Sequence, residues 1–402
     1  MVLFRQPSPT FLMYTYSTTV LHQLLSLLPE QQFQTFVGQH EADKYVKRFT
    51  CFNQLTTLLY AQITGKECLR EIESDLRILD STWGELGIKS VARSTLAYAN
   101  EHRPAAIFES LFYVLFKQCQ SLSQEQSFSF KNPLHAIDAT SVSLCLSLFD
   151  WAKFRTQKGA LRIHTDLNIR NQIPDILDLT DGKTHEVTVV QDMDFSRYTK
   201  GTVFVMDRGY NDYALLQRMK AAGHHFVVRR KKNAQTFALR VHRLAKGKGV
   251  LRDERVAFAL PTAQHNYPQD LRQVTFVDDE GEIYEYLTDE FRLSAANIAE
   301  IYKRRWDIET FFRWVKQNLK IKTFLGTSKN AVLTQIWVAM IYFLLLKWIA
   351  HCIHFTKSLT EMARKLAATC MHHFQLLEVL CCTEKGLQKL HRAREGPQMS
   401  IF

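Results

Sequence analysis

The chain has 402 residues, which is enough for two or three domains with a substantial buried core. Hydrophobic residues make up 46% and charged residues 23%, a balance that excludes a disordered chain, and 15 glycines with 9 prolines are too few for a collagen-like or linker-dominated organisation. The formal charge of +11 favours a polyanionic partner such as a nucleic acid, although compositional drift alone also produces basic proteins.

Eight cysteines are scattered along the chain without a CxxC pair, so we expect reduced thiols and a cytoplasmic protein rather than a disulfide scaffold. No apolar signal region follows Met1, and the most apolar run, 336–346, is too short to span a bilayer and predicts a buried core helix. A zinc site can be imagined near the C-terminus, but its spacing fits no standard pattern. Its candidate ligands are Cys370, His372, His373, Cys381 and Cys382.

Residues 1–125 form the first predicted domain, which is helical throughout. Helical patterns cover 47–63, 67–79 and 90–101, and a short glycine-containing connection precedes the last of them. A helix, a turn and a second helix with polar residues at its start are compatible with a helix-turn-helix, and equally with an ordinary helical bundle.

From about residue 126 the pattern becomes α/β. Strand-like runs alternate with one clear helix, YALLQRMKAAG, and later give way to a β-rich stretch with basic residues. The strand-like runs cover 161–169, 173–179, 202–206, 225–229, 256–260, 274–277 and 283–287. We therefore predict a core of 126–230 and 297–402, the latter including C-terminal helices, interrupted by a β-rich insertion at 231–296.

Two aspartates stand out because of their strand-like surroundings. Asp138 lies in the apolar segment LHAIDATSV, and Asp207 directly follows the short strand TVFVM. A carboxylate at a strand end beside a buried sheet is both rigid and accessible enough to bind a metal ion. The alternative is an aspartate that starts a turn or caps the following helix.

The segment 301–322 carries the strongest signal. On a continuous helix, six polar side chains share a stripe of about 80°, and Ile308, Phe311 and Val315 fall on the other side, so the stripe is predicted to face outward. The stripe contains Tyr302, Arg305, Glu309, Arg313, Lys316 and Lys320. Intrahelical ion pairs would explain part of it, but residues 303–329 hold eight basic and two acidic residues, a surplus that favours an external polyanion.

Four of these residues follow a known spacing. Tyr302, Arg305, Glu309 and Lys316 are separated by two, three and six residues, and this pattern resembles the YREK signature of bacterial DDE transposases of the insertion-sequence IS-four family. The text around it, YKRRWDIETFFRWVKQNLKI, is similar to that family as well. The resemblance covers about 130–350.

AIDAT around Asp138 and VMDRGY around Asp207 resemble the first and second acidic motifs of the same family. The resemblance implies an RNase H-like catalytic core in which Asp138, Asp207 and Glu309 form the acidic triad. It also implies a β-rich insertion between the second and third acids. The N-terminal helical domain would bind the terminal inverted repeats of the element.

The chemistry implied by this resemblance is metal-dependent DNA cleavage. Two Mg²⁺ ions, for which Mn²⁺ can substitute, suit three carboxylates; Asp138 would bridge them, while Asp207 and Glu309 would each hold one. The implied contacts to DNA are made by Tyr302, Arg305, Arg313, Lys316 and Lys320. For Trp306, at the margin of the stripe, base stacking and packing are alternatives.

The expected function is therefore cut-and-paste transposition through a DNA hairpin, by a homodimer that acts on transposon ends and target DNA, without a membrane partner. Two alternatives remain open: a catalytically inactive or domesticated transposase-derived DNA-binding protein, and another RNase H-like nuclease such as a junction resolvase.

Overall fold

The computed structural model describes residues 18–382, except 90, 121, 123–127, 129, 145–148, 150, 152, 156–157, 182–183, 244–248, 320 and 322. Two compact units are present. The first joins the N-terminal part of the chain, up to residue 119, with the part after residue 317, and the second contains 120–317. Each is described by itself.

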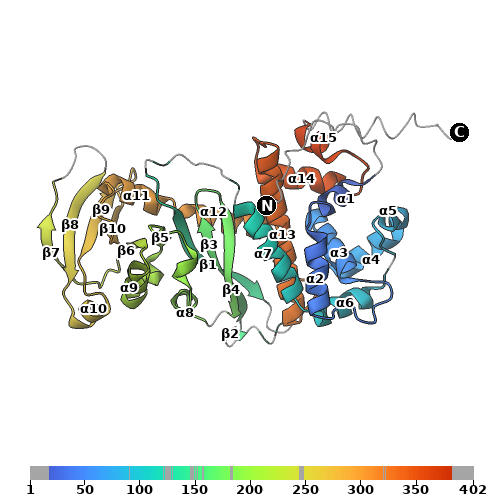
Figure 1. Ribbon diagram of the computed structural model, residues 1–402, viewed down its shortest axis with the longest axis horizontal. Helices are drawn as coiled ribbons and strands as arrows, with labels where there is room; N and C mark the ends of the chain where they lie inside the picture. The colour runs from blue at the N-terminus through green and yellow to red at the C-terminus, as the bar shows by residue number, and fades with distance from the viewer. Residues whose placement is uncertain are drawn as a thin grey trace. The chain divides into compact units, whose positions relative to one another are not determined.

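The first unit is helical (Figure 1). Its helices are α1 (Val20–Leu25), α2 (Glu30–Gln39), α3 (Cys51–Thr64), α4 (Leu69–Ile78), α5 (Asp80–Glu85), α6 (Arg93–His102), α7 (Ala106–Gln120), α13 (Lys329–Cys352), α14 (Leu359–Thr369) and α15 (Leu376–Cys381). The prediction of a helical N-terminal region is confirmed. The connection between α4 and α6 holds the short helix α5, so it is longer than the turn of a standard helix-turn-helix.

Local sequence explains where the central helix α3 begins and ends. The Thr50 side chain accepts a hydrogen bond from the Asn53 amide, and the Asn53 side chain accepts one from the Thr50 amide, which is a reciprocal cap for the first turn. Gly65 ends the helix with a left-handed φ of 72°. Almost every residue between these two ends is buried, and α3 packs against α13 and α14.

Helix α13 is long and apolar enough to cross a membrane by length and composition alone. However, 83% of its most apolar stretch is buried by protein, and it packs against α3, α6 and α14. The run 336–346 lies within this helix and is buried throughout, as the sequence predicts. This is the behaviour of a core helix, for which the protein interior replaces lipid.

The second unit is built on one mixed sheet. Its strands are β1 (Leu134–Leu144), β2 (Lys153–Arg155), β3 (Lys158–Asn168), β4 (Ile173–Asp181), β5 (Val203–Met206), β6 (His225–Arg229), β7 (Thr236–Val241), β8 (Val250–Phe258), β9 (Leu271–Val277) and β10 (Ile283–Thr288). Around it lie α8 (Glu186–Gln191), α9 (Tyr213–Ala221), α10 (Pro261–Asn266), α11 (Ala295–Lys303), α12 (Trp306–Asn318) and the 3₁₀ turns η3 (Phe195–Arg197) and η4 (Arg208–Tyr210).

The strand order identifies the core. Strand β3 pairs antiparallel with both β4 and β1, after which β5 lies parallel to β1 and β6 parallel to β5. Three antiparallel strands followed by two parallel ones form the RNase H-like arrangement, and the predicted α/β fold class is confirmed. Strand β5 is buried on both faces, because α9 belongs to the core cluster of Phe204 and Met206 while α11 contacts the strand as well.

The β-rich stretch after residue 231 continues the core sheet. Strand β10 pairs antiparallel with β6, and β9, β8 and β7 follow outward in that order (Figure 1). Sequence patterns indicated β8, β9 and β10 but missed β7. The apolar residues Phe237, Leu239 and Val241 of β7 stand at alternate positions but are exposed by 46%, 47% and 66%, so this outermost strand has no buried face.

Candidate active site

Two carboxylates lie side by side where two parallel strands part. Ile137 of β1 pairs with Met206 at the end of β5, so Asp138 and Asp207 are the next residues on neighbouring strands. Asp207 Oδ1 accepts a hydrogen bond from the Gly209 amide at 2.7 Å, and a Cβ at position 209 would lie 2.9 Å from the same oxygen. Glycine therefore permits the turn that orients Asp207. This residue also caps η4, which is the role that its sequence position left open as the alternative.

Asp138 is held in an electrostatically unfavourable place. Its side chain is only 17% exposed, and burial raises the pKa of its carboxyl to about 7, against the effect of the Ala139 amide, which donates a hydrogen bond to it at 2.8 Å. The negative charge of Asp207 raises this pKa further, while Arg305 lowers it. A buried carboxyl beside a second one is the arrangement that a bound cation relieves.

The prediction of a continuous helix over 301–322 is wrong, because the chain leaves the helical path between Tyr302 and Glu309. Helix α11 ends at Lys303, a tight turn follows, and α12 begins at Trp306 and ends at Asn318. In this turn the amides bond to carbonyls three residues back, as Arg305 does to Tyr302 at 3.0 Å.

Two residues that were predicted to face outward are buried. Tyr302 is only 5% exposed, and its ring packs 4.5 Å from that of Tyr286 between centroids. Arg305 is 9% exposed. Tyr302 lies on the buried face of α11, and the turn that follows this helix directs Arg305 toward Asp138. The predicted outer stripe is therefore wrong for these two residues.

Arg305 connects the acids of the site. Its guanidinium lies 2.6 Å from Glu309 Oε1 and 3.5 Å from Asp138 Oδ2. The Arg305 side chain is 10% exposed and that of Glu309 31%, so the ion pairs are only partly screened by water. The buried Nε of Arg305 has no hydrogen-bond partner among the described residues. The guanidinium thus supplies part of the positive charge that the acids require.

The rest of α12 follows the predicted pattern. Ile308, Phe311 and Val315 are buried, Arg313 is exposed and Lys316 is half-buried. Lys320 lies outside the described residues. Trp306, for which base stacking and packing were alternatives, is 55% exposed. The Arg305 guanidinium lies 5.4 Å from the centroid of the Trp306 ring. An exposed tryptophan beside a cation leaves a ring face for a ligand base.

A further acidic residue near Asp138 and Asp207 was not predicted from the sequence. Glu186, the first residue of α8, interacts electrostatically with Asp138 and Asp207, and burial raises the pKa of its carboxyl. Arg162 of β3 pairs with Glu186 at 3.7 Å and partly offsets this. Glu186 follows strand β4 after the polar residues GKTH and belongs to no motif, so only the folded chain reveals its position.

The donor set suits a hard divalent cation, because all its members are carboxylates. Among the described residues, however, no three His, Cys, Asp or Glu side chains are grouped closely enough to hold a metal ion. The Arg305 guanidinium pairs with both Glu309 and Asp138. The carboxylates of Asp138 and Asp207 lie on neighbouring strands, and oxygen donors of this kind suit such a cation.

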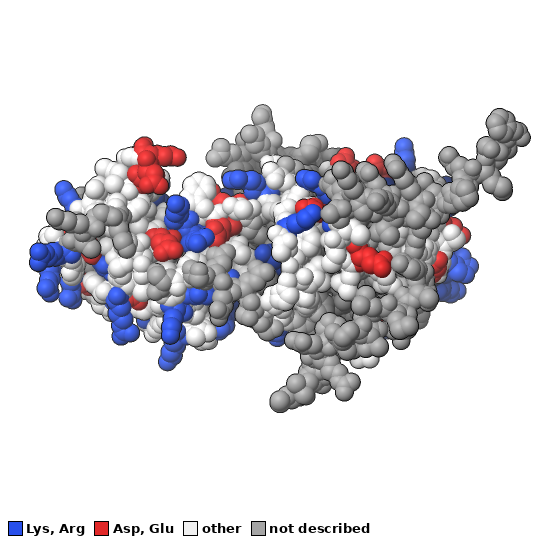
Figure 2. Space-filling view, turned by 90° about the horizontal axis from the view of Figure 1, so that it is seen from above, with Lys and Arg blue, Asp and Glu red and all other residues white. Residues whose placement is uncertain are grey.

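Basic residues also gather away from this site. Figure 2 shows Lys and Arg at the end of the second unit that holds β7 and β8. Exposed arginines of this region are Arg240, Arg243, Arg252 and Arg255. Residues 303–329 account for +6 of the formal charge of +11 (eight basic minus two acidic residues), and the sheet edge adds a second concentration.

Comparison with known proteins places these features in a family. Residues 129–345 match the family model "Transposase DDE domain", and residues 16–89 match a domain of unknown function, DUF4372. The chain is 32% identical to a putative transposase, y4zB, of Sinorhizobium fredii, over 64% of this chain and 71% of the relative. It is 28% identical to a probable transposase for insertion sequence element IS5377 of Geobacillus stearothermophilus, over 65% and 68%.

A third relative, a putative transposase for insertion sequence element IS4SA of Synechocystis, is 25% identical over 64% of this chain and 72% of its own length. Among solved structures, a piggyBac transposase synaptic complex with hairpin DNA is similar, with a TM-score of 0.44 and 10% identity over 92% of this chain and 82% of that one. The match to the DDE domain covers more than half of the chain. The chain belongs to the DDE transposases of IS4-like insertion sequence elements.

Proposed function

We propose that this transposase moves its own insertion sequence by a cut-and-paste reaction, with Asp138, Asp207 and Glu309 as the catalytic and metal-binding acids. The observation that carries the proposal is the convergence of these acids. Two of them lie on neighbouring strands, and Arg305 pairs with both the third and the first. Such a site serves phosphoryl transfer, in which most of the catalysis is positioning and charge neutralisation.

Two divalent cations, Mg²⁺ or Mn²⁺, supply charge neutralisation and activation of the attacking oxygen when they are bound. Asp138 and Asp207 would hold them, with Glu309 as the third acid. Before DNA binds, the Arg305 guanidinium occupies the place between Asp138 and Glu309. A planar guanidinium suits a phosphate as well as a carboxylate, so we infer that Arg305 exchanges Asp138 for a DNA phosphate and thereby frees the carboxylates.

The proposed reaction has four steps in one site. Water attacks the phosphorus at the transposon end, which breaks the bond to the transposon 3′ oxygen and leaves the phosphate on the flanking strand. The freed 3′ hydroxyl attacks the opposite strand, expels the flanking 3′ oxygen and closes a hairpin. Water then attacks the hairpin phosphorus, which releases the transposon 3′ hydroxyl again and leaves a phosphate on the 5′ end of the other transposon strand. That 3′ hydroxyl attacks a phosphorus of target DNA, forms a new phosphodiester bond and expels a 3′ oxygen of the target. A hairpin requires displaced bases, and the exposed ring of Trp306 offers a stacking surface for one.

Other residues would position the DNA. Arg313 and Lys316 lie on α12 beyond Glu309 and suit contacts with phosphates, as Lys320 does by its place in the sequence. The buried Tyr302 ring would support Arg305, whose guanidinium lies 5.7 Å from the ring centroid. The N-terminal helices would bind the terminal repeats, within a homodimer that joins two transposon ends. We place the protein in the cytoplasm, at the nucleoid.

The test is incubation of the full chain with Mg²⁺ and a duplex that joins the end of the element to flanking DNA. We expect a nicked strand followed by a hairpin product on a denaturing gel, and Glu309→Gln should remove both products while binding persists. Asp307→Asn is the matched control, because Asp307 lies on the same turn of α12 but accepts a hydrogen bond from Gln172. Binding without cleavage by the wild type would instead support a catalytically inactive relic.

A further inference from the structure

A basic groove lies on the first unit, whereas the proposed catalytic acids belong to the second. The segment 40–49 between α2 and α3 forms one wall and α6 forms the other, around a space of about 900 Å³. Five Lys and Arg side chains and one acidic side chain, Glu41, line it, together with His40 and His102. Nothing in the catalytic chemistry uses these residues.

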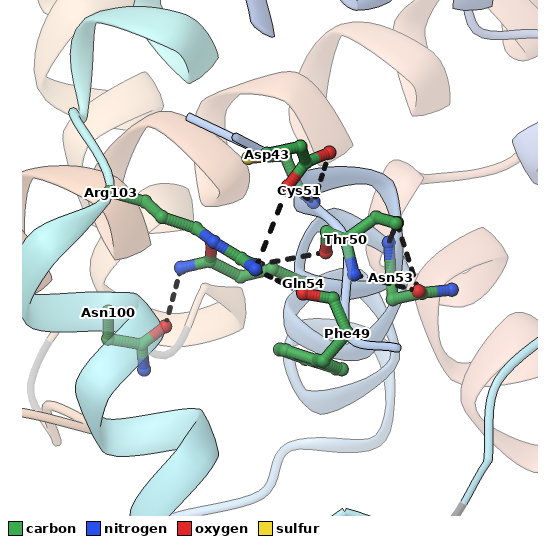
Figure 3. Close-up of polar contacts among 8 residues, drawn as sticks. All are labelled: Asp43, Phe49, Thr50, Cys51, Asn53, Gln54, Asn100 and Arg103. Carbon is green, nitrogen blue, oxygen red and sulfur yellow. Dashed lines mark hydrogen bonds and ion pairs between the residues drawn. The ribbon is translucent and has the colours of Figure 1, made fainter. Parts of the chain in front are cut away.

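One of the five basic residues, Arg103, has a structural role within the unit. Arg103, just after α6, donates hydrogen bonds to the Thr50 carbonyl at 2.9 Å and to the Phe49 carbonyl, and it lies 3.7 Å from Asp43 (Figure 3). Asp43 in turn accepts a hydrogen bond from the Cys51 amide at 2.8 Å. The side chain of Arg103 is 11% exposed. Its charge is therefore balanced, and it fixes the two walls relative to each other.

The remaining cations face solvent. Lys47, Arg48 and Lys89 are exposed, and none of them forms an ion pair with another described residue. Lys44 is paired with Glu41 at 2.7 Å, but both side chains are at least half exposed, so this pair is weak. The groove thus presents an uncompensated row of positive charge on a rigid base, which suits a polyanion.

Helix α6 contributes a polar, exposed face to the groove. Thr95, Tyr98 and His102 lie three and four residues apart and share one face, which lines the groove. Tyr98 is 65% exposed and its ring stacks on that of His102, with 4.0 Å between centroids. A helix of this diameter, about 10–12 Å, fits the major groove of duplex DNA.

We propose that this groove binds duplex DNA at the ends of the element, with Lys47, Arg48 and Lys89 on phosphates and the exposed face of α6 toward the bases. The proposal rests on the proposed function for the identity of the DNA, and it adds the residues and the elements that hold it. The choice of DNA follows from the row of unpaired cations beside a polar helix face.

The experiment measures equilibrium binding of the full chain to a fluorescent duplex of about 30 base pairs, three helical turns, in EDTA so that no cleavage intervenes. The double variant Lys47→Ala with Arg48→Ala is compared with Lys357→Ala with Arg364→Ala. The control pair removes the same charge from the same unit, from residues that do not line the groove.

If two phosphate contacts are lost, the groove variant should bind DNA at least about 10-fold more weakly at 0.1 M salt. The slope of log K against log salt should also become less steep by about 1.8. The control should leave both unchanged. Equal binding by the two double variants would overturn the proposal. Because cleavage plays no part, this result is independent of the gel assay: a groove that binds DNA in a chain that never cleaves it would refute the proposed function alone.

Discussion

Asp138→Asn should make the metal-free protein more stable while it destroys activity. Burial holds the pKa of Asp138 at about 7 instead of 3.8, so the folded chain binds its proton more tightly than the unfolded chain does. The ionised carboxyl therefore destabilises the fold. This cost is absent below pH 3.8, grows as the pH rises, and is complete above about pH 7.

The size of the effect follows from the same shift. About three pKa units at about 1.4 kcal/mol each give about 4 kcal/mol at pH 8. Asparagine keeps an oxygen for the Ala139 amide but turns an amide group toward Arg305, so we expect a net gain of about 2–4 kcal/mol in the free energy of unfolding. For a unit of this size that is a rise of roughly 5–10 °C in Tm. At pH 4.5 only about 1 kcal/mol of the ionisation cost remains, so the gain should be about 3 kcal/mol smaller than at pH 8.

The assay is thermal unfolding followed by circular dichroism in EDTA, at pH 4.5 and pH 8. Asp194→Asn is the control with the opposite sign, because hydrogen bonds from Ser196 lower the pKa of Asp194. Mg²⁺ at pH 8 should raise the Tm of the wild type and narrow its difference from Asp138→Asn. A variant that is less stable than the wild type at pH 8, or whose gain does not depend on pH, would refute the reasoning.

Three further changes test other parts of the structure. Arg305→Lys keeps the positive charge but loses the planar guanidinium that can donate two hydrogen bonds to one phosphate. The single-turnover rate of cleavage should therefore drop about 100-fold while the melting temperature changes little, and full activity would contradict binding of a phosphate by Arg305. Lys316→Ala should reduce the salt slope of DNA binding by about 1, with the half-buried Lys220→Ala as control, and equal slopes would remove Lys316 from the interface. Asp253→Ala should lower the free energy of unfolding in urea by about 3–5 kcal/mol. Arg272 donates two hydrogen bonds of 2.8 Å to Asp253, and the variant leaves this buried guanidinium without a carboxylate partner. A loss below about 1 kcal/mol would show that water reaches the pair.

The strands that carry the acids were predictable because their signals are local. TVFVM is a short apolar run between turns, and a run of that kind is typical of a strand buried on both faces, which β5 is. Pairing of β1 with β5 then places Asp138 beside Asp207. The family resemblance supplied the third acid, Glu309, which composition and spacing alone did not single out from its ion-pairing neighbours.

The inward turn of Arg305 was not predictable from periodicity. The segment from Tyr302 to Lys316 has a regular helical pattern, and such a pattern does not reveal a break of two residues after which Arg305 pairs with the distant Asp138. The same limit explains Glu186, which the fold brings to Asp138 from a distant part of the chain. The basic groove between the segment 40–49 and α6 depends likewise on contacts such as those of Arg103.

The most direct test of the central claim is the single-turnover rate of Mg²⁺-dependent cleavage for the wild type and three amide variants. These are Asp138→Asn, Asp207→Asn and Glu309→Gln, each measured alongside its affinity for the same duplex. If the three acids form one catalytic site, every variant should lose at least about 1,000-fold in rate while its Kd for DNA stays close to that of the wild type. A variant that cleaves at the wild-type rate would contradict the account, because its acid would then stand outside the site.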